Sequence, residues 1–208
     1  MRIYILLIIL ITLYPLHIFS QETKTDAEKN NTHYYKYSIS ASYISITNFF
    51  PKSTDMYELH FGYRLTPKDM ILIKAATWKI FEPMGIPYGP HLEKESEWYP
   101  GRIRELGIGV GYQRMLWKGL FASVQVLPLK KIYLDENNKK IKNGFRLYTS
   151  YHIGYHIPLF KNKLYLEPQI HCNYWPINSK GPDSFEEKEK KWNNYFLFEP
   201  NLFIGFNF

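Results

Sequence analysis

The chain has 208 residues, of which 45% are hydrophobic and 22% charged, and its formal net charge is +7. The length suggests one domain or two small ones, and the composition excludes a disordered chain because enough apolar surface is present to fold. A mean hydropathy of −0.34 excludes a multi-helix membrane protein, and the single cysteine excludes an intramolecular disulfide and any multi-cysteine zinc site. Aromatic residues make up 18% of the chain, an excess that any fold must accommodate.

The N-terminus has the organisation of a secretory signal peptide. Arg2 supplies a positive charge, residues 3–14 form an apolar run broken only by one threonine, and a small residue, Ser20, precedes the expected cleavage point. We therefore predict a signal peptide over residues 1–20 and a polar leader over residues 21–33. The alternative is an uncleaved anchor, although the apolar run is shorter than the roughly 20 residues that a spanning helix needs.

From residue 34 onward, apolar and polar residues alternate with a period of two, which indicates β-strands with one apolar face. Eight such runs follow one another, and no helical pattern of useful length interrupts them. A tilted strand needs about 9–11 residues to cross a bilayer, which is the typical length of these runs. The runs cover residues 35–43, 57–65, 71–78, 105–113, 120–126, 145–157, 164–174 and 196–208.

The connections between these runs alternate between short and long. The short ones cover residues 66–69, 115–119 and 158–163, and the long ones cover residues 79–103, 130–144 and 176–194, with 48–56 intermediate. This asymmetry is typical of an up-and-down barrel in the bacterial outer membrane, which has short periplasmic turns and longer extracellular loops. The sequence therefore predicts an all-β fold, an eight-stranded antiparallel up-and-down transmembrane β-barrel over residues 34–208.

On these features the chain resembles the small eight-stranded outer-membrane β-barrels of Gram-negative bacteria, the porin-like barrel proteins. The most specific part is the tail at residues 202–208, in which apolar residues alternate up to Phe206 and the terminal Phe208. Such a tail looks like the signal read by the barrel-assembly machinery, although Gly205 stands nearer the end than the glycine often found in that signal. The resemblance implies outer-membrane localisation and contact with outer-membrane lipid and lipopolysaccharide.

The apolar residues, which occupy every second position of each strand (the apolar parity), are expected to face lipid. Backbone polar groups in a bilayer must pair within a closed sheet, and the outer face of that sheet must be apolar. Tyrosines on this parity suit the membrane rims, where an aromatic ring is apolar and its hydroxyl stays hydrated. The alternative is a soluble, secreted β-barrel or sandwich, of which a lipocalin-like ligand-binding barrel is one form. That alternative requires the same apolar parity to face inward.

The polar parity is expected to fill the lumen, because an eight-stranded barrel has an interior only wide enough for side chains. Buried charges are tolerated when they are paired, so we predict a polar plug and a closed or barely conducting lumen. The predicted lumen network consists of Glu58, His60, Arg64, Lys74, Glu105, Arg146, His152, His156, Glu167, His171 and Glu199.

Two sharper hypotheses concern this inward face. Ser150 and His152 share one side of a strand, and a glutamate on a neighbouring strand, such as Glu167, could orient the histidine as in Ser–His–acid sites. This spacing is trivial in a strand and matches no motif of the lipid-modifying barrel enzymes, so no catalytic residue is assigned. His60, His152, His156 and His171 could ligate a metal with Glu167, but ordinary lumen histidines are the simpler interpretation. We expect no metal and no cofactor.

Two strands carry a proline directly after an inward glutamate, as Glu167-Pro168 and Glu199-Pro200. Proline lacks the N–H that a strand ladder needs, so each position predicts a bulge or a local break.

The loops account for much of the basic charge. The 79–103 loop combines prolines with aromatic residues and is interpreted as a rigid surface cap or a ligand-binding loop. The loop predicted over 130–144 has five lysines that could contact lipopolysaccharide headgroups, and the mixed charges at 186–191 indicate a solvated tip. No basic helix or compact patch is present, so nucleic-acid binding is not expected.

The function predicted from the sequence is that of a non-enzymatic integral outer-membrane barrel with a structural, surface-interaction or minor solute-passage role. The alternatives left open are a lipid-modifying barrel enzyme and a soluble lipocalin-like barrel.

Overall fold

The computed structural model describes residues 35–49, 55–82, 96, 98–191 and 193–208, so the predicted signal peptide and polar leader lie outside the described residues. Within these residues, two short helices accompany the strands, the 3-10 helix η2 (Tyr43–Phe49) and α3 (Asp183–Glu189). The nine strands are β1 (Tyr37–Ser42), β2 (Met56–Arg64), β3 (Asp69–Ile80), β4 (Arg102–Trp117), β5 (Leu120–Leu134), β6 (Lys140–Tyr155), β7 (Ile157–Leu159), β8 (Leu164–Asn178) and β9 (Tyr195–Asn207).

The strands form one antiparallel sheet that closes on itself. Strands β1 to β5 each pair with the next strand in sequence, β8 pairs with β9, and β1 pairs with β9 to close the ring. The short strand β7 continues β6 after a break at His156, because both pair with β8. The fold is therefore the closed eight-stranded up-and-down barrel that the sequence predicts.

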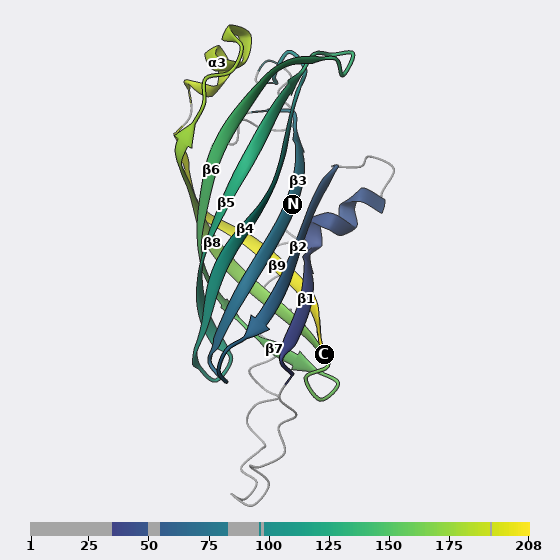
Figure 1. Cartoon of the computed structure of the whole chain (residues 1–208), viewed down its shortest axis with the longest axis vertical. Coiled ribbons are helices and arrows are strands. Elements are labelled where there is room, and N and C mark those ends of the chain that lie inside the picture. Colours follow the sequence, from purple (N-terminus) through teal and green to yellow (C-terminus); the bar gives the residue numbers. More distant parts are fainter. Residues whose placement is uncertain (1–34, 50–54, 83–95, 97, 192) are drawn as a thin grey trace, which may run out of the picture. The chain divides into compact units, whose positions relative to one another are not determined.

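The two ends of the barrel differ. Short turns join β2 to β3, β4 to β5 and β7 to β8 at the end that also holds the C-terminus (Figure 1). The long strands β4, β5 and β6 extend to the opposite end, where α3 lies. Beside them β1 has only 6 residues, and η2 follows it and docks on the start of β2, where Asn48 exchanges hydrogen bonds of 2.7 and 3.2 Å with the backbone of Met56.

The prediction of a long loop over residues 130–144 is wrong. Strand β5 continues to Leu134 and β6 starts at Lys140, so only a tight turn at 135–139 joins them. The period of two continues inward through Leu129, Lys131 and Tyr133, all of which are fully buried. The pattern was missed because lysine is usually exposed, so Lys130 and Lys131 indicated a loop as long as the partner of the buried lysine was unknown.

The 176–194 connection also differs from expectation, because β8 extends to Asn178 and residues 183–189 form α3. This helix has only 7 residues, too few for a helical period to be visible in the sequence. Within the described residues, no helix is both long and apolar enough to cross a membrane.

Pro168 lies at an irregularity, as expected, and Pro200 lies near one. The ladder of β8 with the preceding strand is interrupted opposite Pro168, where β6 ends and β7 begins. The pairing of β8 with β9 shifts register between His171 and Asn173, opposite Phe198, which has a φ of 62° and lies two residues before Pro200. Pro168 therefore lies where the ladder with the preceding strand is interrupted, whereas Pro200 stays in register with Ile170 and the irregularity lies next to it.

The two faces of the sheet have opposite character. Large apolar side chains of the outer face are exposed, as Ile108 is at 69%. Inside, an apolar layer fills the lumen below α3, and its larger members are Trp78, Ile103, Leu127, Leu129, Tyr133, Tyr148, Trp175 and Phe185. The sequence predicts a mainly polar lumen, so this aromatic layer is an addition to that prediction.

Candidate functional site

The lumen holds the polar residues singled out in the sequence, on the inward parity of the strands and buried or half-buried. They do not form one continuous network. They divide into an upper cluster below α3, a middle cluster around a small cavity and a lower cluster near the short turns.

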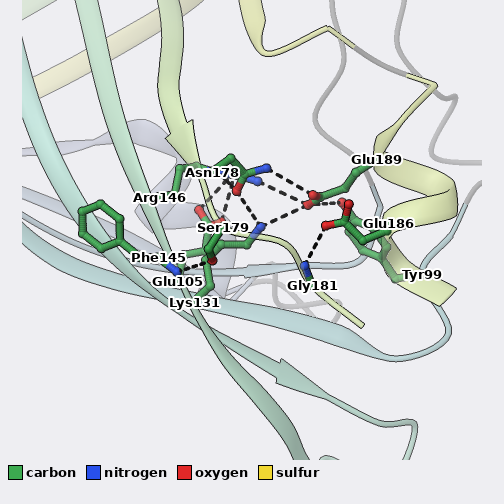
Figure 2. A network of polar contacts seen from close by, with 10 residues as sticks. All are labelled: Tyr99, Glu105, Lys131, Phe145, Arg146, Asn178, Ser179, Gly181, Glu186 and Glu189. Carbon is green, nitrogen blue, oxygen red and sulfur yellow. Dashed lines mark hydrogen bonds and ion pairs between the residues drawn. The ribbon is translucent and has the colours of Figure 1, made fainter. Parts of the chain in front are cut away.

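The upper cluster joins the barrel wall to α3 (Figure 2). Arg146 of β6 contacts Glu105 of β4 at 3.1 Å and Glu189 of α3 at 3.4 Å. Lys131, which has no exposed surface, donates to Glu189 at 3.2 Å and to the Asn178 side chain at 2.8 Å. Two inward cations are therefore balanced by two carboxylates, which is the condition for burying charge in the lumen.

Glu189 is the centre of this cluster, because its carboxylate also accepts from the hydroxyl of Tyr99 at 3.1 Å. Burial alone would raise the pKa of Glu189, but the charges of Lys131 and Arg146 and the hydrogen bonds to the carboxylate outweigh burial and lower the pKa below its usual value. Burial raises the pKa of Tyr99 well above its usual value, so the phenol stays protonated and donates. Below this cluster Phe185 packs between the rings of Tyr99 and Tyr133.

The middle cluster has a second glutamate-centred contact set. Lys74 donates to Glu58 at 2.7 Å, and the Nε2 atom of His60 lies 3.1 Å from the same Glu58 oxygen. The His60 ring stacks on Phe203 with centroids 4.4 Å apart. His60 is therefore held between an acid and an aromatic ring and does not turn toward the other lumen histidines.

Two further histidines meet in the same region. The rings of His152 and His171 lie edge to face at 4.9 Å, and His171 Nε2 is 2.7 Å from a carboxylate oxygen of Glu199. His152 Nε2 lies 2.8 Å from the hydroxyl of Ser150. The Nδ1 atoms of both histidines are buried without a hydrogen-bond partner among the described residues.

The lower cluster contains Glu167, whose carboxylate binds Nδ1 of His156 at 2.9 Å and the side-chain amide of Gln113 at 3.1 Å. The other nitrogen of His156 contacts Asn162 in the last short turn at 3.1 Å. Arg64, at the same end, donates to the backbone carbonyl of Tyr35 at 3.3 Å. These contacts close the lumen near the short turns.

The structure brings together two of the three residues considered for catalysis. Ser150 and His152 are in contact, but Glu167 pairs with His156 in the lower cluster and does not orient His152. The cavity beside them has a volume of about 40 Å³ and is lined by groups that include Ser150, His152, His171, Glu58 and Lys74. This space holds a few water molecules and is far smaller than a pocket for a drug-sized ligand, roughly 300–1,000 Å³.

The histidines and Glu167, considered above as metal ligands, are dispersed among these clusters. Only His152 and His171 meet, while His60 and His156 each pair with a different glutamate. Among the residues that the structure describes, no group of three or more histidine, cysteine, aspartate or glutamate residues is arranged to hold a metal ion.

Three members of the upper cluster are missed by the sequence-based prediction. It puts Lys131 in an exposed loop, Glu189 in a solvated tip and Tyr99 in the 79–103 loop. One signal was available, because Phe185 is an isolated aromatic residue directly before the charged run at 186–191. An apolar residue in that position indicates a segment that packs on something.

Comparisons with known proteins agree with this architecture. No family model matches the chain, and no curated protein matches it. Among solved structures, the chain is similar to the crystal structure of a major outer membrane protein from Thermus thermophilus, with a TM-score of 0.50 and 12% sequence identity. The similarity covers 85% of this chain and 100% of that one. At this identity the likeness supports the β-barrel fold alone.

Proposed function

We propose that this protein is an integral outer-membrane barrel whose lumen is plugged by its own side chains and by α3, and whose role is structural or at the cell surface. The observation that carries the proposal is that polar side chains line the inner face of the barrel and apolar side chains cover its outer face, which is the reverse of a water-soluble barrel. Ion pairs such as Arg146–Glu105 lie inside with almost no exposed surface, while Ile108, Val110 and Ile153 point outward and are more than half exposed. A water-soluble barrel would bury the second set and expose the first.

The height of the apolar band supports the same proposal. On β4 the outward parity has arginine at 104 and again at 114, and the residues of this parity between them are Leu106, Ile108, Val110 and Tyr112. Ten residues span roughly 33 Å along a strand, and a tilt of about 40° reduces this to a height of about 25 Å. This is the height of the apolar band of outer-membrane barrels.

The alternatives are less well supported. A lipocalin-like barrel needs its apolar parity inside, and here that parity faces outward. A lipid-modifying enzyme must bring an acyl chain to its nucleophile, but Ser150 is buried beside a cavity of about 40 Å³. Solute passage needs an open lumen, and the aromatic layer with the upper cluster fills it.

Cell fractionation together with electrophoresis of unboiled samples tests the proposal. The protein is expected in the outer-membrane fraction, with a heat-dependent shift in mobility, and purified protein in planar bilayers is expected to show no stable conductance. Lipid A mass spectra from cells with and without the protein should be identical. A monomer that stays soluble without detergent would overturn the membrane assignment.

A further inference from the structure

One region of the outer surface departs from the even apolar face of the rest. Along β3 the outward residues Ala75 and Thr77 are small, while their register partners on both sides are large. Leu59 and Ile108 flank Ala75, and Tyr57 and Leu106 flank Thr77. The result is a groove of about 300 Å³ that runs over β3 and has an almost entirely apolar lining. Hereafter we refer to it as the β3 groove.

Cations stand at one end of the β3 groove. The next outward residue of β3 is Lys79, which pairs in register with Arg104 of β4. Lys130 of β5 pairs in register with Leu106, one of the groove residues. We call Lys79, Arg104 and Lys130 the cationic cluster. Arg104 reaches back toward the groove, with its guanidinium 3.5 Å from the Thr77 hydroxyl.

The cationic cluster is only partly neutralised. Among the residues that the structure describes, the carboxylate that contacts this cluster is that of Asp55, which lies 2.5 Å from Arg104 and 3.6 Å from Lys79, while Lys130 is exposed. Glu58 also borders the groove, but its carboxylate turns into the lumen toward Lys74. Within the described part of the chain, three positive charges therefore face one negative charge at the point where the apolar band ends.

We propose that the β3 groove and the cationic cluster form a binding site for a phosphorylated, acylated lipid of the outer leaflet. One acyl chain lies over Ala75 and Thr77, and the phosphate contacts Lys79, Arg104 and Lys130. The inference rests on the proposed function, because an outer-membrane barrel with its short turns on the periplasmic side has Arg104 at the outer boundary of the membrane. A lipid fits this surface because it has an apolar chain and an anionic headgroup. The apolar groove and the cationic cluster follow one another along the membrane normal, as the acyl chain and the headgroup of a lipid do.

Native mass spectrometry of the detergent-purified chain tests the site with three probes: diphosphoryl lipid A, monophosphoryl lipid A and phosphatidylcholine. The native chain is expected to retain one diphosphoryl lipid A, to retain the monophosphoryl form more weakly, and to retain phosphatidylcholine least. Near a membrane surface each basic residue strengthens the binding of anionic lipid roughly five-fold, so the double variant Lys79→Gln/Lys130→Gln should lose roughly 25-fold. Lys68→Gln, an exposed lysine in the turn at the other end, is the matched control for charge.

A second variant tests the groove itself. Ala75→Leu fills the β3 groove from the outer face without touching the lumen, and should weaken retention of both lipid A forms. Ala122→Leu places the same added volume on the outward parity of β5, away from the groove, and should leave retention unchanged.

Each remaining outcome has a definite meaning. Equal retention of phosphatidylcholine, unchanged retention in the two test variants, or a dimer that occludes this face would overturn the lipid site. A barrel that shows heat-shifted mobility but no lipid preference refutes the lipid site alone. A chain missing from the outer membrane refutes the proposed function.

Discussion

Lys131 of β5 and Glu189 of α3 are separated by 58 positions in the chain, yet their charged groups meet at 3.2 Å. The contact fixes a surface helix to the barrel wall, and the lysine that makes it has no exposed surface. Removing Glu189 leaves Lys131 without this counterion, whereas removing Lys131 leaves Glu189 in contact with Arg146.

Glu189→Gln is therefore expected to loosen α3. The variant keeps the shape of the side chain but leaves Lys131 and Arg146 with a neutral acceptor, which should cost about 2–3 kcal/mol of unfolding free energy. Denaturant unfolding of the vesicle-embedded barrel and protease cleavage within residues 179–191 measure the effect. Glu187→Gln, at an exposed position of the same helix, should change neither quantity by more than about 0.5 kcal/mol.

The same contact predicts a dependence on pH. The pKa of Glu189 is lower in the folded protein than its usual value of 4.5. The stabilisation is thus fully present above that value and is lost as pH falls through the lower, folded-state value. Protection of α3 from an acid-stable protease should stay constant from about pH 7 to 5 and decline below about pH 4.5. In Glu189→Gln this step should be missing, and an unchanged acid step would show that another group controls α3.

Deleting Phe208 is expected to impair assembly. Phe208 and Tyr37 exchange two backbone hydrogen bonds of 2.9 and 3.0 Å, and their rings stack at 5.9 Å, so the last residue holds the end of the β1–β9 seam. Outer-membrane yield and heat-shifted mobility report the loss. Phe160→Ala removes an exposed aromatic from a turn and should leave the yield intact. A full yield without Phe208 would count against a role in assembly.

A double-mutant cycle at Glu58 and Lys74 tests the middle cluster. Lys74→Met leaves the Glu58 carboxylate without its cation inside the lumen, which should destabilise the barrel by about 3–5 kcal/mol. Lys74→Met combined with Glu58→Gln removes both charges and should recover most of that loss. If the two substitutions were simply additive, the ion pair at 2.7 Å would contribute little to the fold.

The sequence was sufficient to predict the barrel because strand periodicity is local. Each residue faces outward or into the lumen according to its position alone, so eight strands, their order and the inward set could be derived without coordinates. The partner of each inward residue could not be predicted, because it depends on the stagger between strands and on where loops return. Glu167 and His152 illustrate this: both face inward, yet Glu167 pairs with His156.

The upper cluster could not be predicted either, because its contacts also depend on where a distant segment returns to the barrel. Lys131 interrupts an apolar strand pattern, and only the return of α3 with Glu189 makes its burial tolerable. Neither residue indicates the other in the sequence, because β6, β7 and β8 lie between them and the contact depends on where α3 follows β8. In the local sequence, Phe185 was the one residue that indicated that this segment packs on the barrel.

The residues of α3 are of two kinds, those that contact the barrel and those that are exposed. Phe185 and Glu189 tie it to the barrel, whereas Asp183, Ser184 and Glu187 are exposed. Substitutions at these exposed positions leave the contacts of Phe185 and Glu189 with the barrel unchanged. If the short turns are periplasmic, as in outer-membrane barrels, the exposed positions of α3 lie at the extracellular end. The exposed side of α3 can therefore change in sequence while the attachment of the helix to the barrel stays the same.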